Sequence, residues 1–125
     1  MFPQPDTFVA REGNGRDAWE TWTPNRGGWT DVGSPTVSGR WQQRGRLVLI
    51  QVRVAPETTC ATTAGTSYIA LPIDATGFGG CFVMVNTTTN VAVGVCVVDV
   101  ANSRIYVPSQ SATGNTLVIT GWYEV

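Results

Sequence analysis

The stretch Cys81–Val97, CFVMVNTTTNVAVGVCV, carries no charged side chain and few polar ones outside its centre. A turn at residues 87–89 folds it into a β-hairpin that places Cys81 opposite Cys96. Side chains alternate along a strand, so the hairpin has two faces, and neither of them is polar. A hairpin in a small protein usually shows one face to water. Something must therefore cover the second face.

The two faces of this hairpin hold side chains of different size. Next to the turn, Asn86 faces Val91. Counting outward from there gives one face with Phe82, Met84, Val91, Val93 and Val95. The other face holds Cys81, Val83, Val85, Ala92, Gly94 and Cys96. Either the opposing sheet of the same chain or a neighbouring copy could cover it. We favour a neighbouring copy, because small residues let two backbones approach closely and closed homo-oligomers commonly hide such surfaces.

Composition narrows the function. The 125 residues suit one domain with its own core, and the net charge of −1 gives no basic field for a nucleic acid. The chain has no histidine, which is the usual general base and a common metal ligand. Its three cysteines lack metal-ligand spacing. We therefore expect no metal, no cofactor and no enzymatic activity. The cysteines are predicted to be free thiols of a cytosolically made protein, with a Cys81–Cys96 disulfide as the alternative.

The pattern of Val, Thr and Gly predicts an all-β protein with short turns. Strands are expected at Thr7–Arg11, Ala18–Trp22, Thr36–Gln42, Arg46–Ala55, Ser67–Leu71, Gly80–Val85, Val91–Val98, Arg104–Val107 and Thr116–Glu124. This number of strands is typical of a β-sandwich or jelly roll. Residues 1–17 are expected to form a partly ordered connector and residues 18–125 the domain. Neither a signal peptide nor an apolar run of membrane-helix length is visible, so no membrane insertion is expected.

Alternation also assigns faces in two other strands. The strand from Arg46 turns one wholly apolar face to the core: Val48, Ile50, Val52 and Val54. Its second face is half polar and suits partial burial: Leu47, Leu49, Gln51 and Arg53. Trp19 and Trp22 lie three residues apart on a strand, so only one of them faces the core. Trp41 is expected to pack in the core or in an interface.

Four short motifs follow one another along the chain. They are Trp22-Thr23-Pro24, Gly39-Arg40-Trp41-Gln42-Gln43-Arg44-Gly45-Arg46-Leu47-Val48, Ile69-Ala70-Leu71-Pro72 and Thr120-Gly121-Trp122-Tyr123-Glu124-Val125. Gly39 and Gly45 are expected at turns, because glycine adopts positive φ without strain. Pro72 ends a strand, because it cannot donate to a β-ladder. Taken in this order, the motifs resemble the C-terminal domain of bacteriophage tail fibres and tail spikes over residues 19–125.

The resemblance implies an antiparallel β-sandwich of jelly-roll type that assembles as a homotrimer at the distal end of a fibre. It implies a virion protein of the phage tail, assembled in the host cytoplasm and joined to the rest of the tail fibre. Loops at the tip would then bind a bacterial surface polysaccharide or an outer-membrane receptor. Sister chains would cover the second face of the hairpin. The predicted trimer interface is therefore Cys81, Val83, Val85, Ala92, Gly94 and Cys96.

Trp29 is the best candidate for contact with such a ligand. It stands in a polar loop, Asn25–Asp31, where no expected strand requires its burial. An indole offers a flat apolar plate on which a sugar can stack. Arg26 and Asp31 flank it and can hydrogen-bond to hydroxyl groups. The alternative is that Trp29 anchors its own loop. The Thr- and Ser-rich loops at 57–66, 86–90 and 109–115 are solvated turns or further polar contacts for a ligand.

Two rival functions remain open at this point. One is a folding cap that trimerises the fibre without binding a receptor. The other is a carbohydrate-binding module attached to a polysaccharide-degrading enzyme. The nine carboxylates are scattered, and no spacing selects the pair that a glycosidase needs. Asp74 and Asp99 are expected to be turn residues.

Overall fold

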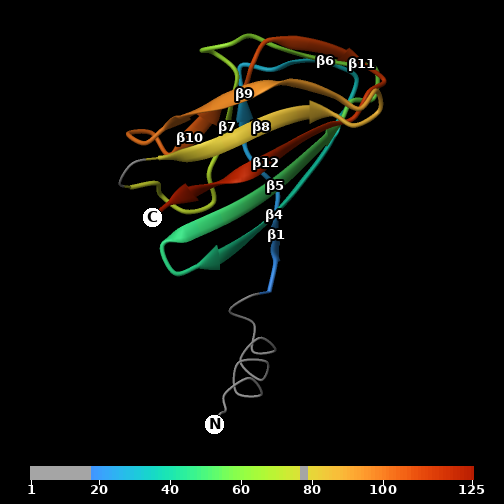
Figure 1. Ribbon diagram of the computed structural model, residues 1–125. Helices are drawn as coiled ribbons and strands as arrows, with labels where there is room; N and C mark the ends of the chain where they lie inside the picture. The colour runs from blue at the N-terminus through green and yellow to red at the C-terminus, as the bar shows by residue number, and fades with distance from the viewer. Residues whose placement is uncertain (1–17, 77–78) are drawn as a thin grey trace.

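The computed structural model describes residues 18–76 and 79–125, which fold entirely into strands and their connections (Figure 1). All strand pairings are antiparallel. The strands are β1 (Glu20–Trp22), β2 (Arg26–Gly27), β3 (Thr30–Val32), β4 (Thr36–Arg44), β5 (Leu47–Ala55), β6 (Thr59–Thr62), β7 (Tyr68–Ala70), β8 (Gly80–Asn86), β9 (Val91–Asp99), β10 (Arg104–Tyr106), β11 (Gln110–Thr113) and β12 (Leu117–Glu124). The all-β prediction is confirmed. The expected connector 1–17 and strand Thr7–Arg11 lie outside the described residues.

Nine strands form one large sheet in the order β1-β4-β5-β12-β8-β9-β10-β7-β2. Its two edge strands, β1 and β2, are separated by only residues 23–25. Four Cα steps reach at most about 15 Å, whereas a flat sheet of this many strands is roughly 38 Å wide. The sheet must therefore curl until its edges approach each other. It does so as a half-barrel (Figure 1).

The concave side of this sheet holds the core. The predicted core face of β5 is confirmed, because its four residues are each at most 1 % exposed: Val48, Ile50, Val52 and Val54. On the neighbouring strands β12 and β8, Leu117, Ile119, Tyr123, Phe82 and Met84 join the same buried cluster. Trp22 and Trp41 pack against it, while Trp19 is 37 % exposed. Each buried aliphatic side chain contributes about 1.5–3 kcal/mol, so this face dominates the stability of the fold.

A second, three-stranded sheet consists of strands that were not expected from the sequence. It has the order β11-β6-β3 and brings Cys60 and Ala112 into the main core. The expected loops 57–66 and 109–115 were therefore wrong in their central parts, which form β6 and β11. Only alternate residues of β6 are buried, namely Cys60 and Thr62. A short threonine-rich strand that buries so little apolar surface resembles a solvated loop in sequence.

The β8–β9 hairpin departs from the expected register by one residue. Asn86 pairs with Val91 as predicted, but a β-bulge then shifts the ladder, and Phe82, not Cys81, faces Cys96. A bulge inserts one unpaired residue on one strand and changes which side chains point inward. Consequently Cys96 is buried and Cys81 is exposed, and all three cysteines are free thiols. The alternative of a cross-strand Cys81–Cys96 disulfide is ruled out by this arrangement.

The two glycines of the second motif have different roles. Gly45 lies in the tight turn between β4 and β5 with a φ of 61°, as expected. The prediction for Gly39 was wrong, because it lies within β4 and not at a turn. A Cβ added at Gly39 would lie 2.7 Å from the Trp22 ring and 3.0 Å from Pro24. Gly39 is therefore needed for the close packing of the Trp22-Thr23-Pro24 motif.

The last two motifs also meet in space. The hydroxyl of Tyr123 donates to the backbone oxygen of Ile73 at 2.7 Å and accepts from its amide at 3.1 Å. Ile73 follows the predicted strand-ending Pro72. The segment after β7 is thus fixed to the terminal strand β12.

Candidate functional site

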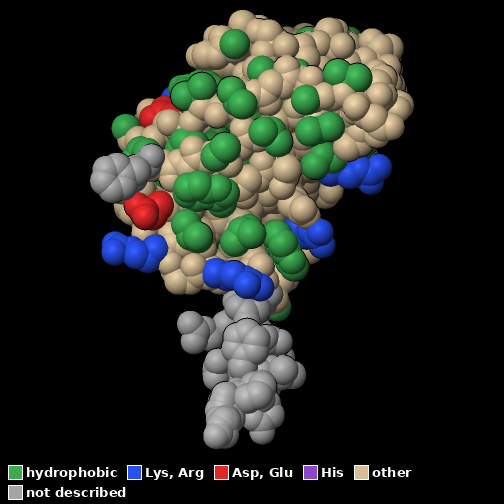
Figure 2. All heavy atoms as spheres, viewed as in Figure 1, with side chains coloured by type: hydrophobic (Ala, Val, Ile, Leu, Met, Phe, Trp, Pro, Cys, Tyr) green, Lys and Arg blue, Asp and Glu red, His purple; other side chains and the backbone are tan. Residues whose placement is uncertain are grey.

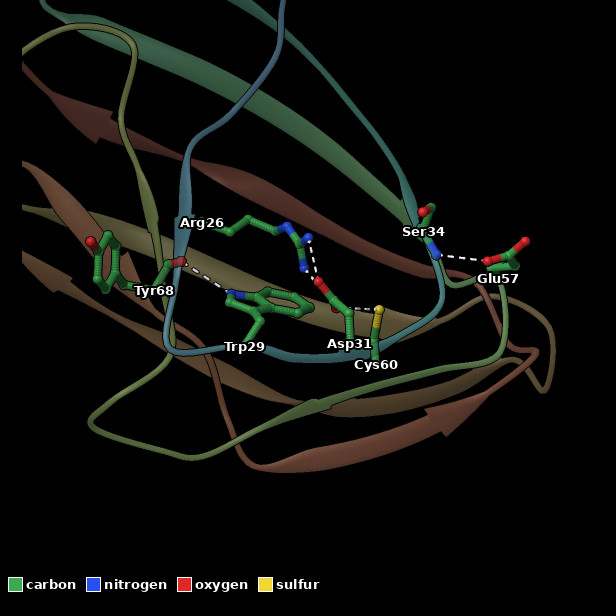
Figure 3. Close-up of polar contacts among 7 residues, drawn as sticks. All are labelled: Arg26, Trp29, Asp31, Ser34, Glu57, Cys60 and Tyr68. Carbon is green, nitrogen blue, oxygen red and sulfur yellow. Dashed lines mark hydrogen bonds and ion pairs between the residues drawn. The ribbon is translucent and has the colours of Figure 1, made fainter.

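The three predicted ligand residues lie together (Figure 3). The guanidinium of Arg26 donates to both carboxylate oxygens of Asp31, at 3.2 and 2.9 Å. The same guanidinium lies 4.9 Å from the centre of the Trp29 ring. This cluster follows from local structure, because β2 pairs with β7 while β3, a few residues later, pairs with β6. The short connection between the two sheets carries Trp29.

The polar groups of this cluster are largely occupied by one another. The Trp29 indole donates to the backbone oxygen of Tyr68 at 3.1 Å, and the ring packs against the core. The Cys60 thiol donates to Asp31 at 3.1 Å. The Arg26 and Asp31 side chains are only 14 % and 24 % exposed. These contacts favour the alternative that Trp29 anchors its loop and connects the two sheets.

The charges of the cluster show the same mutual dependence. The hydrogen bonds from Arg26 lower the pKa of Asp31, against an opposing effect of burial. Burial, helped by the nearby Asp31 carboxylate, raises the pKa of Cys60 to about 12. Cys60 therefore stays a protonated thiol and is a poor nucleophile.

The bulge divides the six predicted interface residues between two faces. We call the side of the large sheet opposite the core its outer face. Cys81, Val83, Val85 and Ala92 lie there, as their pairings and exposure indicate. Gly94 and Cys96 instead point inward: a Cβ at Gly94 would lie 3.2 Å from Pro108, and Cys96 is 8 % exposed. The sequence did not predict the inward positions of Gly94 and Cys96, because no residue type in the hairpin indicates a bulge. Val95 and Val97 take the outward positions.

The outer face has an apolar half formed by β9, β8 and β12. We define this apolar half as Val95, Val97, Cys81, Val83, Val85, Val118 and Trp122. Val95, Val97 and Trp122 are 67 %, 63 % and 45 % exposed. Figure 2 shows hydrophobic side chains gathered over the middle of this face. Among residues 18–76 and 79–125, nothing covers the exposed valines and tryptophan of this face.

The remainder of the outer face, on β5, β4 and β1, is polar and carries arginines. Arg40 faces Gln51, and Arg53 faces Ser38, on paired strands. Figure 2 shows Arg side chains along the border of the sheet on the β4 side. Sequence reasoning recognised the polar positions Gln51 and Arg53 but missed Arg40 as their neighbour. The pairing of β4 with β5 places Arg40 opposite Gln51. Counting outward from the turn at Gly45 would have predicted this neighbour.

Of the two carboxylates predicted to lie at turns, Asp99 has hydrogen-bond partners within the protein. Asp99 accepts from both the backbone and side-chain nitrogens of Asn102, at 3.3 and 2.9 Å. These bonds lower its pKa. Asp99 is the last residue of β9, and these bonds hold the turn that follows the strand. Two further carboxylates, Glu20 and Asp31, stand on strands of different sheets.

Within residues 18–76 and 79–125, no group of three or more His, Cys, Asp or Glu side chains is placed to hold a metal ion. The same residues include no helix long and apolar enough to span a membrane. Comparison of the chain with protein-family models, with curated proteins and with solved structures finds no match.

Proposed function

We propose that this chain is the C-terminal domain of a bacteriophage tail fibre or tail spike. In this proposal the curled sheets form a jelly-roll-type β-sandwich that assembles as a homotrimer. The trimer then binds a receptor on the bacterial surface, a glycan in the first instance, and has no catalytic role.

The observation that carries the proposal is the apolar half of the outer face. Soluble monomers rarely leave a contiguous apolar patch of this kind in water. Val95 and Val97 are more than 60 % exposed, and burying each aliphatic side chain contributes about 1.5–3 kcal/mol. Three copies that pack these faces around a common axis would remove the whole patch from water.

The way the motifs meet adds support. Trp22 and Pro24 of the first motif pack on Gly39 of the second. Tyr123 of the fourth is bonded to Ile73, directly beyond the third. Motifs that are weak one by one thus form two contacts that fix the fold. These contacts support treating the four motifs as parts of one resemblance.

The mass in solution tests the proposal. Light scattering of the whole chain is expected to give three times its 13.4 kDa mass. Val95→Arg should give folded monomers, because a charge within the apolar half cannot be buried without a partner. Val32→Arg is the matched control: Val32 is 54 % exposed but lies on β3 of the small sheet, so this variant should remain trimeric.

Two outcomes would contradict the proposal. One is a wild-type chain that stays monomeric at high concentration. The other is a Val95→Arg variant with unchanged mass. A trimer that binds neither whole bacteria nor isolated surface polysaccharides would instead support the folding cap that fixes the fibre's register.

A further inference from the structure

The polar part of the outer face contains a hollow of about 360 Å³. Its lining includes Thr21, Ser38, Arg40, Gln51, Arg53 and Val118. We call it the arginine hollow. Most of its surface is apolar, and the polar groups of the side chains around it are two guanidinium groups, two hydroxyl groups and one amide, with no carboxylate among the described residues that line it. These groups can donate hydrogen bonds to an anion.

The pairing of β4 with β5 fixes the two arginines relative to each other. Arg40 faces Gln51, and Arg53 faces Ser38 two residues further along. The arginines are therefore diagonal neighbours on one face, with backbones about 7–8 Å apart. Two positive charges on neighbouring strands repel each other, and an anion bound between them would reduce that repulsion.

Arg40 is held in place by uncharged groups. Its Nε donates to Oε1 of Gln51 at 2.7 Å, and its guanidinium lies 4.7 Å from the centre of the Trp19 ring. One of its five donors is used, and the terminal nitrogens remain available. Within the described parts of the chain, the ion pairs involve Arg26 and Arg104 but neither Arg40 nor Arg53. The hollow thus presents two charges without a carboxylate partner.

We propose that the arginine hollow binds an oxyanion carried by an acidic saccharide, either the carboxylate of a uronic acid or a phosphate group. Guanidinium groups bind both through paired, charge-assisted hydrogen bonds. Thr21 and Ser38 add hydroxyls for the neighbouring sugar hydroxyl groups. The choice of a saccharide as carrier rests on the proposed function, whereas the oxyanion site rests on the hollow itself.

Calorimetric titration of the whole chain at low salt tests the inference with three probes. They are an oligogalacturonate, a poly(glycerol phosphate) and neutral dextran. Binding of either anionic probe, with none to dextran, is expected, and the probe that binds identifies carboxylate or phosphate as the source. Arg40→Gln and Arg53→Gln should each weaken that binding roughly tenfold or more, as expected for a lost charge-assisted interaction.

Two further variants distinguish binding at the arginine hollow from nonspecific attraction of an anion to positive charge on the protein. Arg46→Gln removes the same charge at the β4–β5 turn, away from the hollow, and should change the affinity less than about twofold. Gln51→Glu places a carboxylate beside Arg40 and should abolish binding in a folded protein, because it supplies the anion internally.

The inference is overturned if neither anionic probe binds, or if Arg46→Gln weakens binding as much as Arg40→Gln does. Light scattering on the same samples keeps the two proposals apart. A trimer that binds neutral cell-surface glycans but ignores both anionic probes would reject the arginine hollow and leave the proposed function standing.

Discussion

At the scale of single residues, Asp31 shows how a candidate ligand group is used by the protein itself. It accepts two hydrogen bonds from Arg26 and one from the Cys60 thiol. Arg26 belongs to the large sheet and Cys60 to the small one. The carboxylate therefore links the two sheets, and Trp29 packs beside it. Removing its charge should weaken the fold.

Asp31→Asn should lower the free energy of unfolding by about 1 kcal/mol at neutral pH, as for a partly exposed ion pair. The folded-state pKa of Asp31 lies below its ordinary value of 3.8. The contribution is therefore complete above that pH and is lost as the pH falls through the folded-state value. Urea unfolding of both proteins across this range should show the difference shrinking below pH 3.8.

Asp74→Asn is the control, because Asp74 is exposed and lies outside the hydrogen bonds and ion pairs of the described residues. Its stability should follow that of the wild type at every pH. A gap between wild type and Asp31→Asn that does not shrink at all as the pH falls below 3.8 would mean that the carboxylate charge is not the cause.

The chemistry of Trp29, Arg26 and Asp31 could be foreseen only in part. Their closeness along the chain predicted a cluster, and the cluster exists. The use of the indole N–H by Tyr68 could not be foreseen, because that contact joins residues 39 positions apart. Long-range partners decide whether such a polar group faces a ligand or the protein.

At the scale of elements, strand β12 connects three parts of the fold: two neighbouring strands and the segment after β7. It pairs with β5 on one side and β8 on the other. Its Tyr123 is fully buried and bonds twice to the Ile73 backbone. Burial raises the pKa of this hydroxyl to about 12. The neutral hydroxyl is therefore the form that makes both bonds.

Tyr123→Phe should lower the free energy of unfolding by about 1–3 kcal/mol, because it leaves a backbone N–H and C=O of Ile73 unpaired near the core. Thermal unfolding followed by circular dichroism measures the loss. Tyr68→Phe is the matched control, since no hydrogen bond of the Tyr68 hydroxyl occurs among the described residues, and its stability should stay within about 0.5 kcal/mol of wild type. An equal loss in both variants would show that the two hydrogen bonds to Ile73 do not account for the stability lost in Tyr123→Phe.

Strands that bury a continuous apolar face were foreseeable, and β5 is the clearest case. Short edge strands were not. β2 has only two residues and β3 only three, so neither is long enough to show the alternating pattern that marks a strand. The bulge in β9 was equally hidden, since every residue around it is small or aliphatic and fits either face.

At the scale of the whole molecule, the curled sheet turns two different surfaces outward. The apolar half lies on β9, β8 and β12, and the arginine hollow lies on the β5, β4 and β1 side. Both belong to one face of one sheet. Trimer contacts and an anion site can therefore lie side by side without competing for the same residues, apart from Val118, which belongs to both.

Cys81 offers a direct readout of the assembly, because it lies in the apolar half and is exposed in the single chain. Cys60 and Cys96 are buried, and burial raises the pKa of each to about 12. In the native protein, Cys81 alone should react with a maleimide. In the proposed trimer the sister chains cover it, so its labelling should be slow at high protein concentration and become faster on dilution.

The Val95→Arg variant should label rapidly at every concentration, because its copies cannot pack around the introduced charge. Val32→Arg, altered on the small sheet, should follow the wild type. Intact-mass spectrometry counts the labels, and after unfolding all three thiols should react. If wild-type Cys81 labels at the same rate at every concentration, the apolar half is not covered by sister chains. Protection that depends on concentration, and is lost in Val95→Arg alone, can arise only when copies associate through this face.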